Sequence, residues 1–251
     1  MNLDNKRFVP ASTHESTKLN IMKNHLVVLC VIILAGFISR LHSFDFAIET
    51  LTVPDGIEYS FVPQYFKKYH TWRLRFNHTF IPSRYPFGVS LLLLPFTYLF
   101  HNEGAGIILL LLVGTGVIPM IYYLVKKIFD ADVAILSALI VSLCPLTIKY
   151  SSIIMSDMIS GFFLILILLI YFYYADNKMA YVIMGICSGY MFMLRFSNAL
   201  FFIPILLLII YKNNIRSISE KILLFMGPIC AFIIITMIYD RGLLGGVFIT
   251  G

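Results

Sequence analysis

Long apolar runs separated by short polar breaks make up most of the chain. The first run extends from about His25 to Ser43. Further runs lie at 105–125, 132–150, 158–175, 179–195, 198–211 and 220–239. A helix crosses the hydrocarbon layer with roughly 20 mainly apolar residues, so this pattern predicts an all-α integral membrane protein, a polytopic bundle of about seven transmembrane helices.

Composition and charge exclude a soluble globular domain. Hydrophobic residues make up 59% of the chain and charged residues 13%, whereas soluble domains are about 45–50% apolar. The net charge of +6 does not indicate nucleic-acid binding, because the basic residues occur singly or in pairs at the ends of apolar runs. Membrane lipid is therefore the predicted partner. The four cysteines lie inside apolar runs without metal-ligand spacing, which predicts inert buried thiols.

The segment Val89–His101 decides the predicted topology. It is too short for an upright span. If it crossed the membrane, the basic pair Lys126-Lys127 and then Lys178 would lie outside, against the positive-inside rule. We therefore predict that it does not span. The tail of residues 1–24 is then cytoplasmic, and residues 44–104 form a long first external loop with juxtamembrane segments.

This topology places the main polar positions on one external side of the membrane. They are Asp55, Glu58, Asp157, Arg195 and Asp240-Arg241. Because these ionisable residues converge on one side, we expect the chemistry of this chain to lie there.

Short motifs with a characteristic order surround these positions. Asp55-Gly56 and Glu58-Tyr59 follow the first run, and Ser83-Arg84-Tyr85-Pro86 opens a later apolar run. Ser156-Asp157 begins one span, and a helix with Gly185 and Gly189 ends at Arg195. Together they resemble the GT-C glycosyltransferases, nearest to the dolichyl-phosphate-mannose-type and lipid A aminoarabinose-type group known as family 39.

The resemblance covers nearly all of residues 25–251. It implies a GT-C-like transmembrane domain whose first external loop carries juxtamembrane helices. Family members generally continue through further spans, so the chain is expected to be the N-terminal part of such a domain, and the activity of this part alone is an open question. The resemblance also predicts Tyr239-Asp240-Arg241-Gly242 to open the next external loop.

The implied activity is transfer of a hexosyl or pentosyl group from a polyprenyl phosphate. The donor would be a dolichyl- or undecaprenyl-phosphate sugar, and the acceptor a hydroxyl of a glycan, lipid or protein. The reaction would take place at the extracytoplasmic or lumenal face of a cell or endoplasmic reticulum membrane.

Such a transfer needs a base for the acceptor proton and positive charge for the leaving phosphate. Asp55 is the candidate base, and the resemblance makes it the first-loop acid and Asp157 the second acid of the family. Glu58 could share the acid role. Carboxylate oxygens also suit Mg²⁺ or Mn²⁺, so Asp55 and Asp157 are candidate ligands of a divalent cation.

Basic and aromatic residues complete the predicted donor site. Arg84, Lys149 and Arg195 are predicted to bind the lipid phosphate, with Tyr59 and Tyr85 beside them. Each candidate has a structural alternative. Asp55 suits a turn, Asp157 suits a helix cap, and the basic residues suit interfacial snorkelling.

Two further interpretations concern the loop and the protein class. Tyr65–Arg75 mixes aromatic and basic residues and favours a helix lying on the bilayer. The alternative to an enzyme is a non-catalytic membrane module or a transporter- or channel-like subunit. A transporter would place ionisable residues in mid-span, and the apolar runs have none near their centres, which favours an enzyme.

Overall fold

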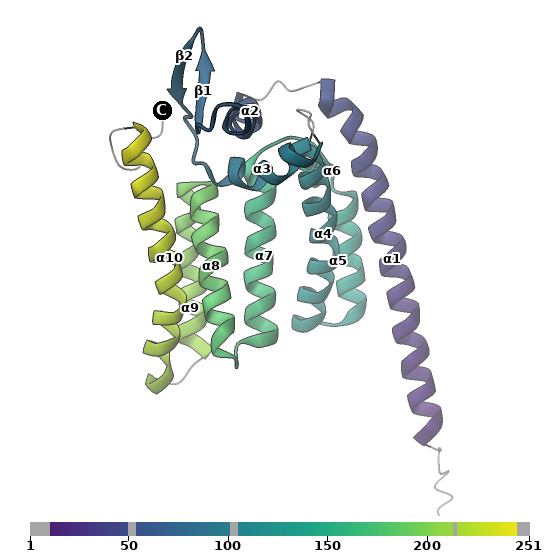
Figure 1. Ribbon diagram of the computed structural model, residues 1–251. Helices are drawn as coiled ribbons and strands as arrows, with labels where there is room; N and C mark the ends of the chain where they lie inside the picture. Colours follow the sequence, from purple (N-terminus) through teal and green to yellow (C-terminus); the bar gives the residue numbers. More distant parts are fainter. Residues whose placement is uncertain (1–10, 50–53, 101–104, 213–214, 245–251) are drawn as a thin grey trace, which may run out of the picture.

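The computed structural model describes residues 11–49, 54–100, 105–212 and 215–244. It is a bundle of long helices with two helices and a β-hairpin at one end (Figure 1). The helices of the bundle are α1 (Ala11–Glu49), α4 (Ala105–Ile128), α5 (Ala131–Leu143), α7 (Ser156–Tyr174), α8 (Lys178–Leu194), α9 (Phe202–Lys212) and α10 (Ile215–Leu244). The end that carries α2 (Pro54–Tyr69) and α3 (Gly88–Phe100) is called the α2 end below.

Four described helices are long and apolar enough to cross a membrane. Their spanning segments are Asn24–Ser43, Gly106–Ile128, Ser156–Tyr174 and Ser217–Gly242. Four shorter apolar helical segments accompany them: Gly88–Phe100, Ala131–Leu143, Lys178–Leu194 and Phe196–Lys212. The prediction of a helical membrane protein is confirmed, while the count of seven spans is not. The cytoplasmic side of the N-terminus stays a prediction.

Local backbone geometry makes two breaks between helices, one inside the predicted span 132–150 and one between the predicted spans 179–195 and 198–211. The run 132–150 divides at Cys144, whose backbone is extended (φ −62°, ψ 119°) because Pro145 follows it. Pro145 then begins the short helix α6 (Pro145–Tyr150). At Arg195 the backbone is again extended (φ −162°, ψ 126°), and the 3₁₀-helix η1 (Phe196–Phe201) connects α8 to α9. Both breaks lie at the α2 end (Figure 1).

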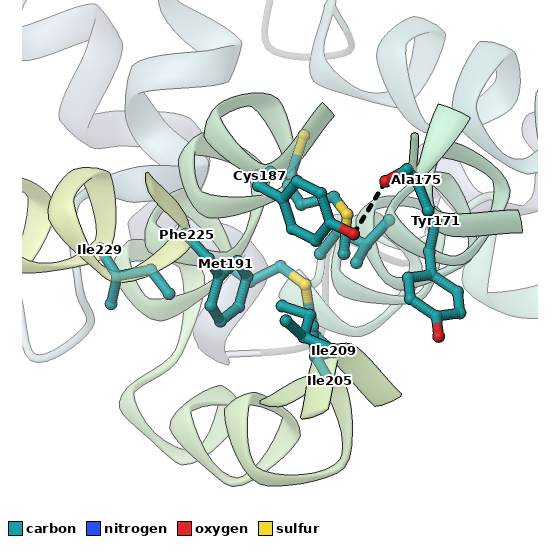
Figure 2. Close-up of a cluster of buried hydrophobic side chains, with 11 residues drawn as sticks. Tyr171, Ala175, Cys187, Met191, Ile205, Ile209, Phe225 and Ile229 are labelled. Carbon is teal, nitrogen blue, oxygen red and sulfur yellow. Dashed lines mark hydrogen bonds between the residues drawn. The ribbon is translucent and has the colours of Figure 1, made fainter. Parts of the chain in front are cut away.

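The core of the bundle consists of apolar clusters shared by neighbouring helices. Figure 2 shows the cluster between α7, α8, α9 and α10, in which Tyr181 donates a hydrogen bond to the Ala175 carbonyl at 2.9 Å. Gly185 and Gly189 let α8 approach α10 closely, because a Cβ at either position would collide with Phe225 or Phe232. The predicted glycine-spaced helix therefore serves helix packing.

The loop after α1 contains a hairpin that the sequence interpretation missed. Strands β1 (Arg73–Phe76) and β2 (Thr79–Pro82) pair antiparallel, joined by Asn77 and His78. Both residues have positive φ (43° and 71°), as two-residue hairpin turns require. The prediction of one interfacial helix over Tyr65–Arg75 is thus wrong in its second half, since α2 ends at Tyr69.

Helix α3 packs against α2 across the end of the bundle instead of running beside the long helices (Figure 1). This placement agrees with a non-spanning Val89–His101 segment, of which residue 101 lies outside the described residues. Another expectation is wrong: Tyr239-Asp240-Arg241-Gly242 does not open a loop, because α10 continues to Leu244. The chain beyond 244 lies outside the described residues.

A buried arginine, Arg40, connects α1 to the α5–α6 break. The sequence interpretation assigned it no role. Arg40 is fully buried. It donates to the carbonyl oxygens of Gly36 (2.9 Å), Ser142 (3.1 Å) and Val141 (3.3 Å), and to the hydroxyls of Ser151 (3.1 Å) and Thr147 (3.3 Å). Because these oxygens satisfy the guanidinium, the charge can be buried without a carboxylate.

Candidate functional site

Two neighbouring pockets lie at the α2 end and have Arg195 in common. The first, called the Asp55 pocket, has a volume of about 250 Å³ and is lined by Asp55, Tyr59, Arg84, Tyr85, Pro86, Arg195, Phe196 and Ser197. The second, called the α7–η1 pocket, has a volume of about 200 Å³ and is lined by Asp157, Ser160, Gly161, Leu164, Arg195, Asn198 and Phe201.

Asp55 lies in the first turn of α2, directly after Pro54. Proline suits the first helical position, and a carboxylate there is stabilised by the helix dipole. The Tyr85 hydroxyl donates to Asp55 Oδ1 at 2.5 Å, and this bond raises the pKa of Tyr85 above its ordinary value. The turn that the sequence offered as the structural alternative for Asp55 is therefore wrong. The helix instead directs one oxygen of Asp55 to Tyr85.

Tyr59 follows Asp55 by one helical turn and is buried. Burial raises the pKa of Tyr59 to about 12. Its ring packs on that of Tyr85, with centroids 5.3 Å apart. Both tyrosines therefore stay protonated near neutral pH, so they can donate hydrogen bonds but cannot serve as bases.

Glu58 holds Arg84 at the edge of the Asp55 pocket. Glu58 Oε1 accepts from Arg84 Nε (2.6 Å) and Nη2 (2.5 Å), and Oε2 accepts from Arg84 N (2.9 Å) and Ser83 Oγ (3.1 Å). Hydrogen bonding to Glu58 raises the pKa of Arg84. Glu58 is buried and lines neither pocket, so its sharing of the acid role stays a prediction while its contacts orient Arg84.

Asp157 and Arg195 form an ion pair between α7 and the end of α8. Arg195 Nη1 donates to Asp157 Oδ1 at 2.8 Å, and the two side chains are 48% and 41% exposed. Asp157 does not cap α7, whose N-cap is Met155. Arg195 follows Leu194, where α8 ends, so the extended backbone at the helix break carries its side chain to the junction of the two pockets.

The two predicted metal ligands line different pockets. Asp55 contacts Tyr85, and Asp157 contacts Arg195. In the described part of the chain, no group of three or more His, Cys, Asp or Glu is placed to hold a metal ion. A shared cation would need further oxygens from water or phosphate. The divalent cation stays a prediction.

The structure brings together part of the predicted phosphate site. Arg84 and Arg195 both line the Asp55 pocket, but Lys149 is exposed on α6 and lines neither pocket. Asn198, which the sequence interpretation did not assign, is buried and donates to Ser160 Oγ and to the Met191 carbonyl, both at 2.8 Å. It fixes η1 to α7 and α8. The sequence signal that could have identified Asn198 is a side-chain amide in an otherwise apolar run, because a buried amide needs hydrogen-bond partners.

Comparison with known families adds an independent finding. A family model described as dolichyl-phosphate-mannose-protein mannosyltransferase matches residues 84–239, which is more than half of the chain. The match begins at Arg84 and includes Asp157 and Arg195, while Asp55 lies before it. No curated protein and no solved structure matches the chain.

Proposed function

Because the chain belongs to the dolichyl-phosphate-mannose-protein mannosyltransferase family of GT-C-type membrane glycosyltransferases, we propose that it transfers a sugar from a polyprenyl phosphate to a hydroxyl acceptor in the Asp55 pocket. One observation carries the proposal. The pocket combines a carboxylate, which contacts a tyrosine hydroxyl, with the side chains of Arg84 and Arg195. Family membership also favours an enzyme over the transporter alternative.

Asp55 acts as the general base in this proposal. The Tyr85 hydroxyl fixes Oδ1, and the acceptor hydroxyl approaches the other oxygen. As the acceptor oxygen bonds to the anomeric carbon, the bond from that carbon to the phosphate oxygen breaks. The acceptor proton passes to Asp55, and the electron pair of the broken bond stays on the lipid phosphate. A positioned base of this kind contributes about 10²–10⁴-fold to a rate.

Arg84 and Arg195 stabilise the negative charge that develops on the leaving phosphate. A guanidinium can donate two parallel hydrogen bonds to phosphate oxygens. Glu58, which does not line the pocket, holds Arg84, and Asp157 holds Arg195 from the neighbouring pocket. Preorganised charges of this kind need little rearrangement during the reaction.

The same site supports the proposed location of the reaction. The pocket lies at the α2 end, beside the polar segment that precedes the second apolar run. Lys126 and Lys127 lie in the last turn of α4, and the positive-inside rule favours the cytoplasmic side for such residues, which supports an extracytoplasmic or lumenal pocket. The sugar is a hexose or pentose, and the acceptor is a hydroxyl of a glycan, lipid or protein.

The test is Asp55→Asn in a sugar-transfer assay with dolichyl-phosphate and undecaprenyl-phosphate sugars, using protein in lipid nanodiscs. Asparagine keeps the shape of the side chain but removes its basicity, so turnover should fall about 10²–10⁴-fold. Asp130→Asn is the matched control. Asp130 caps α5 by accepting from Val133 N at 2.8 Å, a bond that asparagine can keep. Equal transfer rates for the two variants would contradict the proposal.

A further inference from the structure

The start of α3 lies directly against the backbone of the last turn of α8. A Cβ built at Gly88 would collide with the Met193 carbonyl oxygen and lie 2.9 Å from Leu194 N. Only glycine lets the two backbones approach this closely. Arg195 follows Leu194, so this contact lies next to one of the two arginines that line the Asp55 pocket.

Tyr190 adds a hydrogen bond to this contact. Its hydroxyl donates to the Gly88 carbonyl at 2.7 Å, although the two residues are 102 positions apart. The Tyr190 ring packs between two neighbouring helices, with centroids 5.4 Å from Phe163 of α7 and 6.1 Å from Phe232 of α10. Because these rings surround it, the hydroxyl has a defined place from which to hold Gly88.

A short segment with little freedom connects Gly88 to Arg84. Pro86 fixes its own φ. Phe87 is buried and stacks on Tyr239 of α10, with ring centroids 4.0 Å apart. A displacement of Gly88 therefore moves Arg84 with it.

From these contacts we infer that Tyr190 is a positioning residue, which sets the spacing of Arg84 and Arg195 across the Asp55 pocket by holding Gly88 on the end of α8. Tyr190 lines neither pocket, so it acts through the arginines. The ligand, a lipid phosphate that both guanidinium groups contact, rests on the proposed function. Two cations hold one phosphate together only at the right spacing, so a displacement of about 1 Å weakens their joint contact.

Tyr190→Phe removes the hydroxyl and keeps the ring between its neighbours. Tyr171→Phe is the matched control. The Tyr171 hydroxyl also donates to a carbonyl of another helix, that of Leu208, at the same distance of 2.7 Å, and Tyr171 lines neither pocket. Thermal unfolding should therefore show similar shifts for the two variants, and any difference in ligand binding reports on position.

The experiment measures binding of undecaprenyl phosphate and dolichyl phosphate by native mass spectrometry, with each tyrosine variant made in the wild-type and in the Arg84→Gln background. In the wild-type background, Tyr190→Phe should weaken binding about threefold to tenfold, the size of one lost hydrogen bond. In the Arg84→Gln background it should change binding less than about twofold, because no second cation remains to be positioned. Tyr171→Phe should bind like its parent in both backgrounds.

Two results of this binding cycle would overturn the inference. If Tyr190→Phe weakens binding by the same factor in both backgrounds, its effect does not depend on Arg84. If Tyr190→Phe binds like Tyr171→Phe, the hydrogen bond to Gly88 serves the fold alone.

Amide hydrogen exchange of residues 84–91 separates the failure of this inference from that of the proposed function, because it needs no ligand. Exchange should be about threefold to tenfold faster in Tyr190→Phe than in the wild type, and unchanged in Tyr171→Phe. Unchanged exchange in Tyr190→Phe would overturn the inference even if binding falls. If the wild type binds neither polyprenyl phosphate, the donor class is wrong, and the exchange rates alone decide whether Tyr190 holds this segment.

Discussion

Two arginines at breaks between helices have opposite surroundings. Arg40 at the α5–α6 break is fully buried and donates only to neutral carbonyl and hydroxyl oxygens among its described contacts. Arg195 at the α8–η1 break is 48% exposed, pairs with Asp157 and lines two pockets. The guanidinium of Arg40 is occupied by hydrogen bonds within the fold, whereas that of Arg195 can reach a ligand in either pocket.

The comparison shows what makes an arginine structural or functional in this chain. Both residues carry the same charge, and each lies at or against a break between two helices. What differs is access: α4 approaches Arg40 through Gly114, where a Cβ would collide with Ser151 and lie 3.2 Å from Arg40 Nε. The tight packing excludes any ligand from Arg40. At Arg195 the helix break leaves space on two sides.

The largest effect on stability is expected for Arg40→Leu. Leucine removes all the hydrogen bonds of the guanidinium and leaves space among α1, α5 and α6, which should cost about 3 kcal/mol or more. Thermal unfolding in detergent should then shift down by roughly 10 °C. Lys149→Leu is the control, since Lys149 is exposed on α6. A shift no larger for Arg40→Leu than for Lys149→Leu would show that the buried contacts add no stability.

Arg195→Gln should act on binding and leave stability nearly unchanged. It removes a charge-assisted contact to phosphate, so polyprenyl-phosphate affinity should fall by about 1–3 kcal/mol, or about 5- to 150-fold. Its partner Asp157 is 41% exposed, so solvent stabilises the carboxylate left behind. Native mass spectrometry and thermal unfolding of the same sample measure both quantities. If Arg195→Gln lowered the stability but left the affinity for polyprenyl phosphate unchanged, Arg195 would have a structural role like that of Arg40.

Tyr85→Phe should reduce turnover by about tenfold. The substitution keeps the ring against Tyr59 but removes the hydroxyl that fixes Asp55 Oδ1, and one such bond is worth roughly 1.5 kcal/mol. The effect should appear in kcat more than in KM. Tyr173→Phe is the control, because the Tyr173 hydroxyl donates to the Tyr123 carbonyl away from both pockets. Equal turnover in the two variants would remove Tyr85 from the site.

Glu58→Gln should have the smallest effect, about threefold to tenfold in donor affinity. Glutamine can still accept one hydrogen bond from Arg84 but no longer supplies charge to it, and an exposed partner limits such a pair to about 1 kcal/mol. A positioning role predicts a higher KM at nearly constant kcat. A loss of kcat as large as that of Asp55→Asn would instead support Glu58 as the acid predicted from the sequence.

Hydrophobic patterning predicted most helices because the residues of each apolar run must either insert into the membrane or pack against other helices. The first span, predicted as His25–Ser43, lies at Asn24–Ser43 in the structure. Pro145 was a local signal for a break after Cys144, but the length of the apolar run 132–150 indicated a single span. The hairpin requires positive φ at Asn77 and His78. It was missed because Asn-His is a weaker turn signal than Asn-Gly.

The site was predictable only in part. Motif order indicated Asp55, Arg84 and Arg195, which do line one pocket. It could not show that Lys149 lies outside that pocket or that Glu58 contacts Arg84, because such contacts depend on how distant segments pack. Arg40 was missed for the same reason: its partners Ser142 and Ser151 follow it by 102 and 111 residues.

The most direct test of the catalytic claim compares sugar transfer by Asp55→Asn and Asp157→Asn in the same lipid nanodiscs, with donor binding measured alongside. Asp55→Asn should bind the donor but lose about 10²–10⁴-fold in turnover, whereas Asp157→Asn should retain far more turnover because Asp157 acts on Arg195. Near-normal transfer by Asp55→Asn together with loss in Asp157→Asn would contradict the role of Asp55 as the base and move the essential acid to the α7–η1 pocket.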